Sequence, residues 1–189
     1  MRKALPVLLL SLLAIAYPLG VFFGLQFMEP RLVGLLLAGL FGLRILFSRD
    51  RLSQTVRPLL PVMVLAMLCS AVAFVLNSHA SLRITPALIN FASMMVFAIT
   101  LWKGPPMIER FARLTDPDLN DKAVAYTRVV TKAWCLFFFI NGCIATYTAF
   151  YSSLEVWTLY NGLIAYGLMG AFFAVEFLVR RCVKKAYES

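Results

Sequence analysis

Residues 84–102 read ITPALINFASMMVFAITLW, and residues 133–154 read AWCLFFFINGCIATYTAFYSSL. Neither stretch contains a Lys, Arg, Asp or Glu. A helix of about 20 apolar residues, rising about 1.5 Å per residue, crosses the hydrocarbon core of a bilayer. Both stretches therefore predict transmembrane helices.

The same pattern recurs along the chain. Residues 4–28, 59–82 and 156–175 are also uncharged, and residues 32–47 are interrupted only by Arg44, whose aliphatic stem allows its guanidinium to reach the interface. We predict six transmembrane helices, at residues 6–28, 31–48, 59–77, 84–102, 131–152 and 156–179. Short connections join them in pairs. The predicted fold is all-α: one polytopic membrane domain over residues 1–189, with three antiparallel hairpins.

The composition supports this class. Of the 189 residues, 61% are hydrophobic and 14% are charged, and the mean hydropathy is +0.83. A soluble domain has about 45–50% apolar and about 25% charged residues, and a small one leaves much of its surface in water. The composition excludes a soluble enzyme, a disordered tail and a disulfide-stapled secreted module.

The basic residues predict the orientation. The chain has 18 Lys and Arg against 9 Asp and Glu, a net charge of +9. A cytoplasmic N-terminus places 16 of the 18 basic residues on the inner side, with Arg31 and Arg83 as the exceptions. Cytoplasmic loops carry such an excess of Lys and Arg. We therefore expect a multi-pass membrane protein with both termini cytoplasmic, and no nucleic-acid partner.

The N-terminus allows a second interpretation. Residues 1–16 have the outline of a secretory signal, with two basic residues, an apolar run and a small-residue cleavage site. The apolar run continues to Met28, which favours an uncleaved first helix.

The only long connection is the predicted cytoplasmic loop, residues 103–130. It begins KGPP, which should end the preceding helix. Helical spacing then puts an apolar set on one stripe and charged residues on the other, which predicts a short helix lying in the headgroup plane. The apolar set is Met107, Ile108, Phe111 and Leu114, and the charged set is Glu109, Arg110 and Arg113. Asp116 and Pro117 resemble the start of another helix.

Two groups of side chains are candidate binding residues. Basic residues on the cytoplasmic side could contact partner proteins or anionic lipid headgroups, at about 1 kcal/mol per Lys or Arg near the membrane surface. These are Lys103, Arg110, Arg113, Arg128, Lys132, Arg180 and Arg181. Polar residues within the spans are Arg44, Asn141, Asn161 and Glu176.

These polar residues have structural explanations as well as functional ones. Asn side chains can bridge helices in lipid. Glu176 precedes Arg180 by four residues, which predicts an ion pair on one helix face. An acid within a span can also bind a proton or a substrate, and the sequence leaves both roles for Glu176 open.

Catalytic and metal-binding motifs are missing from the sequence. The four cysteines, Cys69, Cys135, Cys143 and Cys182, form no C-x-x-C pair, and His79 is the only histidine. We expect four free thiols, no metal site, no cofactor and no catalytic residue. The sequence leaves the oligomeric state open.

Residues 102–110 read WKGPPMIER, and they are followed at fixed spacings by Ala133, Trp134, Phe137, Phe138, Gly142, Tyr147, Ala149, Phe150 and Trp157. In these residues the chain resembles the intracellular septation protein A family of bacterial inner-membrane proteins. The resemblance covers roughly residues 84–180, and it implies a protein of the bacterial inner membrane. The chain departs from the family at Asn161, where a Lys is typical, and at Ala145, where an Asn is typical.

A closer likeness is to a related group of bacterial membrane proteins, often encoded beside genes for aryl polyene or fatty-acid-like lipids. It rests on PPM at 105–107, TDPDL at 115–119, EVW at 155–157 and LYNG at 159–162. The resemblance implies an inner-membrane protein linked to the cell envelope or to division, without an established chemistry.

Three function classes follow from these observations. The first is a non-enzymatic scaffold or accessory protein in envelope biogenesis or lipid-product assembly. The second is a small transporter or flippase for a lipid or lipid-linked product. The third, an enzyme acting at the cytoplasmic face, would need Glu109, Asp116, Asp118 or Asp121 as an acid or base, and no nucleophile–base pair accompanies them. We favour the scaffold.

Overall fold

The computed structural model describes residues 32, 35, 39, 60–76, 79–114 and 116–188. Helix is the only regular secondary structure among these residues. The elements are α3 (Leu60–Leu76), α4 (His79–Trp102), α5 (Met107–Ala112), α6 (Asp121–Tyr151), α7 (Leu154–Thr158), the π-helical turn η2 (Leu159–Ile164) and α8 (Ala165–Glu188). The predicted spans 6–28 and 31–48, and Arg44, lie outside this description except for residues 32, 35 and 39.

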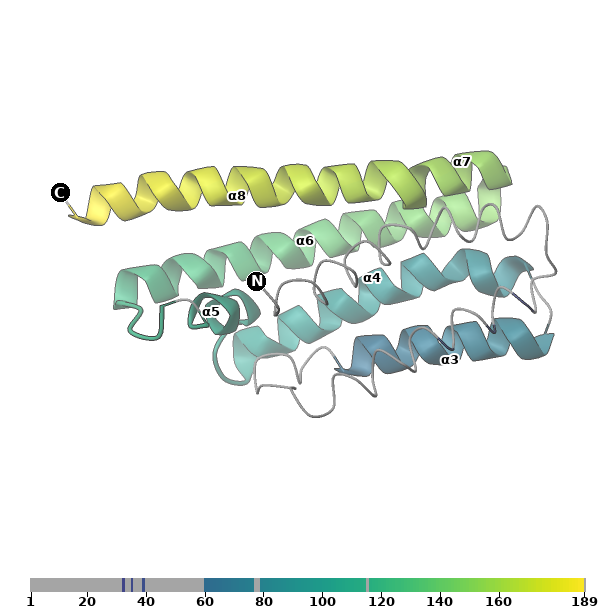
Figure 1. Cartoon of the computed structure of the whole chain (residues 1–189), viewed down its shortest axis with the longest axis horizontal. Coiled ribbons are helices and arrows are strands. Elements are labelled where there is room, and N and C mark those ends of the chain that lie inside the picture. Colours follow the sequence, from purple (N-terminus) through teal and green to yellow (C-terminus); the bar gives the residue numbers. More distant parts are fainter. Residues whose placement is uncertain are drawn as a thin grey trace, which may run out of the picture.

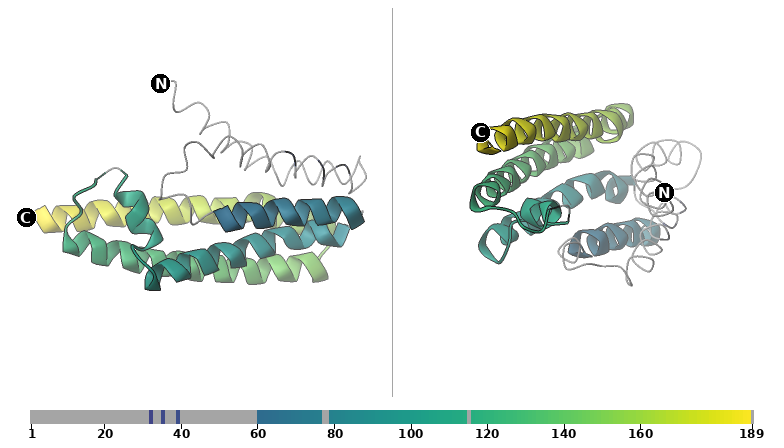
Figure 2. Two further views of the ribbon diagram at one scale, coloured as in Figure 1. Left: turned by 90° about the horizontal axis from the view of Figure 1, so that it is seen from below. Right: turned by 60° about the vertical axis from the view of Figure 1, so that its left-hand side comes forward.

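The long helices lie side by side in the order α3, α4, α6, α8, and each runs antiparallel to the next (Figures 1 and 2). Helices α7, η2 and α8 follow one another without a break and form one rod. The short helix α5 lies at one end of the bundle and α7 at the other, and we call these the α5 end and the α7 end (Figure 1).

Three of the helical segments are long and apolar enough to cross a membrane: Ala80–Trp102, Asp121–Tyr151 and Leu154–Arg180. The apolar part of α3, Leu60–Cys69, is shorter. Large apolar side chains stay exposed along these helices, among them Val75, Met95, Leu136, Phe150 and Leu163. Soluble proteins rarely expose apolar patches of this extent, so the described residues have the surface of a membrane protein.

Helix α6 differs from its predicted span. It begins at Asp121, ten residues before the predicted start at residue 131. Its N-cap is Asn120, whose Oδ1 accepts a 2.8 Å hydrogen bond from the amide of Ala123. Asp116 and Pro117 do not begin a helix, so that prediction was wrong. The cap amide and the acidic first turn both stabilise a helix start at Asn120.

The helix predicted within the 103–130 connection is confirmed as α5. Its location in a headgroup plane stays a prediction. The connection before it turns at Gly104, where φ is +90°, a conformation that side chains other than Gly rarely adopt.

A cluster of buried side chains joins α4, α5 and α6 near the α5 end. Its members are Val96, Phe97, Met107, Val130 and Trp134. Partly buried rings from α6 and α8 surround it, with Trp134 lying 4.6 Å from both Phe172 and Phe173 between ring centroids. This cluster positions α5 and holds α8 against α6.

Candidate functional site

Helix α5 is fixed to the two central helices through its own N-terminal amides. The amide of Met107 donates to Oγ1 of Thr100 in α4 at 3.0 Å, and that of Ile108 donates to Oγ1 of Thr131 in α6 at 3.3 Å. The first amides of a helix have no partner within the helix, so buried hydroxyl groups replace water here. The Met107 side chain is completely buried beneath them.

The charge pattern of α5 was predicted only in part. Ile108 and Phe111 pack on the core cluster, whereas Leu114, placed on the apolar stripe by the prediction, is 62% exposed. Glu109 was predicted on the polar face and is instead buried. Its Oε1 lies 2.8 Å from Nε of Arg113. The prediction for Glu109 was wrong because both α4 and α6 cover α5. Together they bury more than one stripe of this six-residue helix.

Six of the seven predicted basic contact residues lie toward the α5 end. Arg128 donates from Nη2 to the carbonyl of Leu101 at 2.7 Å, and Arg110 donates from Nε to the carbonyl of Pro105 at 2.8 Å. The first bond holds the last turn of α4, and the second holds the connection that follows α4. The set, which we call the basic platform, is Lys103, Arg110, Arg113, Arg128, Lys132 and Arg180; all are exposed except the half-buried Arg110. The side chain of Arg181 lies outside the description.

The predicted intramembrane amides are buried and hydrogen-bonded to other helices. Nδ2 of Asn141 in α6 donates to Oδ1 of Asn90 in α4 at 3.1 Å. The hydroxyl of Tyr160 in η2 donates to Oδ1 of Asn141 at 2.6 Å. Asn161 donates from Nδ2 to Oγ1 of Thr148 at 3.2 Å and to the carbonyl of Trp157 at 2.9 Å. These amides therefore bridge α4, α6 and η2, as expected for Asn in lipid.

Glu176 and Arg180 form the predicted ion pair. Arg180 Nε lies 3.6 Å from Glu176 Oε1, and the Glu176 side chain is 13% exposed. The hydroxyl of Tyr126 in α6 donates to the backbone carbonyl of Glu176 at 3.4 Å. The pair thus lies where α6 and α8 meet near the α5 end.

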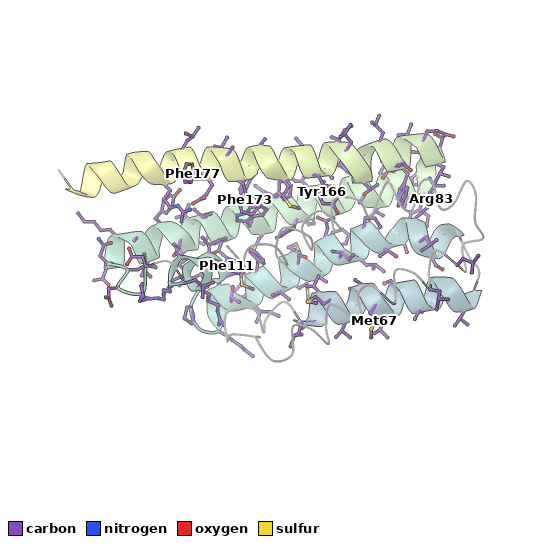
Figure 3. All side chains as sticks on the ribbon, viewed as in Figure 1. Met67, Arg83, Phe111, Tyr166, Phe173 and Phe177 are labelled. Atoms are coloured by element: carbon purple, nitrogen blue, oxygen red, sulfur yellow. The ribbon has the colours of Figure 1, made fainter. Side chains whose placement is uncertain are left out.

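Sequence reasoning missed the role of Arg83. Its Nη2 donates to the carbonyl groups of Thr148, at 2.9 Å, and Ser152, while its own carbonyl accepts a 3.0 Å bond from Nε1 of Trp157. These four residues, which we call the Arg83 clasp, join α4, the end of α6 and α7 at the α7 end (Figure 3). The final carbonyl groups of a helix have no partner within it and attract a cation.

A signal for the clasp was present in the sequence, because Arg83 is one of two basic residues that break the charge asymmetry. Among basic residues with described side chains, Arg83 alone lies at the α7 end. Its guanidinium satisfies carbonyl groups at the end of α6.

An apolar groove of about 310 Å³ runs between α6 and α8. Phe137, Ile140 and Ile144 line it from α6, and Leu168, Ala171 and Val175 line it from α8. Asn141 and Tyr160 also reach it, and these two are hydrogen-bonded to each other.

The acidic residues that an enzyme at the cytoplasmic face would need are exposed or ion-paired. Asp116, Asp118 and Asp121 are exposed, and Glu109 is paired with Arg113. Cys69, Cys135 and Cys143 are free thiols. No group of three His, Cys, Asp or Glu side chains able to hold a metal ion occurs within the described part of the chain.

Comparisons of the chain with protein-family models, with curated proteins and with solved structures give no match.

Proposed function

We propose that this protein is a non-enzymatic scaffold or accessory protein of the bacterial inner membrane, acting in cell-envelope biogenesis or lipid-product assembly. It has six transmembrane helices in three hairpins, with both termini in the cytoplasm. The likeness to septation protein A and to the group encoded beside aryl polyene genes supports the envelope assignment. Its partners are membrane lipids and other envelope proteins.

The charge distribution supports the orientation. The α5 end carries the basic platform, and the α7 end carries Arg83, whose guanidinium is engaged by α6. The positive-inside rule then makes the α5 end cytoplasmic. A reporter that is active only outside the cytoplasm, fused after Ser189, should be inactive, and its activity would overturn the orientation.

The observation that carries the scaffold proposal is the way α5 is held. Two buried hydroxyl groups, the buried side chain of Met107 and the Arg128 bond to Leu101 fix the connection between α4 and α6. A connection fixed in this way presents its cations in one arrangement. Preorganised surfaces bind partners with less loss of conformational entropy than mobile ones, so the basic platform is suited to an acidic partner surface.

Crosslinking in intact cells tests this proposal. A photoreactive amino acid replaces Lys103 or Lys132, both exposed on the basic platform, and the crosslinked products are identified by mass spectrometry. We expect the same protein partners from both positions. A matched control at Tyr151, which is 78% exposed at the α7 end, should not capture them. Recovery of lipid alone from the platform positions would contradict the proposal that the basic platform binds a partner protein.

The groove between α6 and α8 favours a second candidate function, a small transporter or flippase for a lipid or lipid-linked product. Ligand sites in helical bundles lie between helices, and this groove reaches the bridging residue Asn141. Purified protein in vesicles, assayed for movement of a fluorescent phospholipid between leaflets, tests it. Movement no faster than in protein-free vesicles argues against transport of phospholipid and leaves the scaffold proposal untouched.

A further inference from the structure

The groove between α6 and α8 has the shape of a site for one extended chain. Its α6 wall runs from Phe137 to Ile144, which is about 10 Å along the helix axis, and α8 supplies the facing wall from Leu168 to Val175. Half of the hydrocarbon core of a bilayer is about 15 Å deep. The groove is therefore comparable in length to the depth of one leaflet.

The lining selects hydrocarbon over a polar ligand. Seven of its nine lining residues are apolar, and the other two, Asn141 and Tyr160, already use their polar groups internally. The Tyr160 hydroxyl donates to Oδ1 of Asn141, whose Nδ2 donates to Asn90. A polar ligand would lose its hydrogen bonds to water without gaining replacements, which is costly.

A protein helix is too wide to enter the groove. A helix is at least about 10 Å across, so a 10 Å length of one fills roughly 800 Å³. The groove holds about 310 Å³. A single hydrocarbon chain is the narrower occupant that bilayers supply at this depth.

The aromatic contacts explain why the groove stays open. Trp134, Phe137 and Phe172 pack against one another, with centroid distances of 5.4 Å for Trp134–Phe137 and 5.5 Å for Phe137–Phe172. These rings separate α8 from α6 at one end of the groove. Past the rings, in the direction of Tyr160, the facing side chains are smaller, and Ala171 is the smallest of them.

We propose that this groove binds one acyl chain of a bilayer phospholipid. The proposal rests on the membrane placement proposed above, and it requires neither the scaffold role nor lipid transport. The acyl chain enters from the surrounding leaflet and packs beside Ala171.

The test uses the full-length protein in nanodiscs of phosphatidylcholine carrying a diazirine on one acyl chain. After illumination, unreacted lipid is removed and adducts are mapped by mass spectrometry. We expect adducts enriched at Ile140, Ile144 and Leu168 over Leu136 and Phe150, which are exposed on α6 away from the groove. Equal labelling of groove and reference residues, or an unlabelled groove with crosslinks between protein copies, would overturn the proposal.

Two substitutions on α8 sharpen the test. Ala171→Trp fills the groove, whereas Ala174→Trp adds the same ring at an exposed position that does not line it. Groove adducts should be largely lost in Ala171→Trp, because its ring occupies the space that the acyl chain needs, and should persist in Ala174→Trp. Equal adduct yields in the two variants count against the proposal.

Two further measurements distinguish failure of the acyl-chain proposal from misfolding of a variant and from failure of the proposed membrane placement. Leu168→Phe is a milder filling variant that should also lower the adducts if Ala171→Trp does not fold. A protein that can be stripped from cell membranes by alkaline carbonate would refute the membrane placement itself. If crosslinking from Lys103 captures no protein partner, the scaffold role is refuted and the acyl-chain proposal is unaffected.

Discussion

The interface between α4 and α6 and the interface between α6 and α8 join equally apolar helices in different ways. At the first, a Cβ placed on Gly142 would lie 3.0 Å from Cε1 of Phe91 and 3.3 Å from Cβ of Asn90. On α8, by contrast, Gly167 and Gly170 are exposed, and a Cβ on either would meet nothing within 4 Å. The small residues of α6 are used for close approach, and the glycines of α8 are not.

The difference extends to the whole of each interface. Between α4 and α6, Ala145 is fully buried beside the Asn90–Asn141 bond, and small residues with interhelical hydrogen bonds are the usual means of helix association in lipid. Between α6 and α8, large aromatic rings form the contacts and a groove remains. In α8, Ala165 is the only buried residue among the described side chains. We infer that α4 and α6 form a fixed centre and that α8 is the adaptable side.

The largest expected effect is at Gly142. Gly142→Leu forces several atoms into the space of the Phe91 ring and should destabilise the fold by about 3 kcal/mol, the upper part of the range for overpacking. Gly170→Leu, the matched control on α8, should be close to neutral. Unfolding by SDS titration in mixed micelles measures both. Equal losses in the two variants would contradict a close approach of α4 and α6 at Gly142.

Arg83→Met should give the next largest effect. It removes the donor for the carbonyl groups of Thr148 and Ser152 and should cost about 2 kcal/mol, in the range for hydrogen bonds from a charged group. The same titration measures it, with Lys103→Met, at an exposed position of the basic platform, as the control. If both variants lose the same stability, the Arg83 clasp does not stabilise the α7 end.

The Asn90–Asn141 bond should show a smaller coupling. A double-mutant cycle with Asn90→Ala and Asn141→Ala should give about 0.6 kcal/mol, the average for interhelical hydrogen bonds in membrane proteins. Asn90 and Phe172 lie on opposite sides of α6 as a control pair, and their substitutions should be additive. A coupling no larger than that of the control pair would contradict the bridging role.

The Glu176–Arg180 pair should contribute least. It is an i, i+4 pair with Arg180 half exposed, so Glu176→Gln should cost about 0.3–0.5 kcal/mol. High salt should remove the difference from the parent protein, because salt screens exposed charges. Unchanged stability together with loss of the partners crosslinked from Lys103 would instead assign Glu176 a functional role.

Hydropathy predicted the helices of the second half of the chain, and local spacing predicted the Glu176–Arg180 pair and the existence of α5. These depend on residues a few positions apart, so the chain encodes them directly. The start of α6 was missed because the span was predicted from its apolar run alone. Asn120, which is as good an N-cap residue as Asp116, lies outside that run. The burial of Glu109 was missed because it depends on two helices that cover α5 from different sides.

The sequence by itself determined the class of protein: apolar segments of crossing length, separated by connections in which the basic residues gather. It also singled out Arg83 as an exception without indicating its role. Only the tertiary structure decided that Arg83 closes the end of α6, that Asn141 joins α4 to η2, and that α6 approaches α4 closely while leaving a groove toward α8. Hydropathy measures how each segment partitions between water and lipid, whereas which faces meet depends on side-chain shape and hydrogen bonding between segments far apart in the chain.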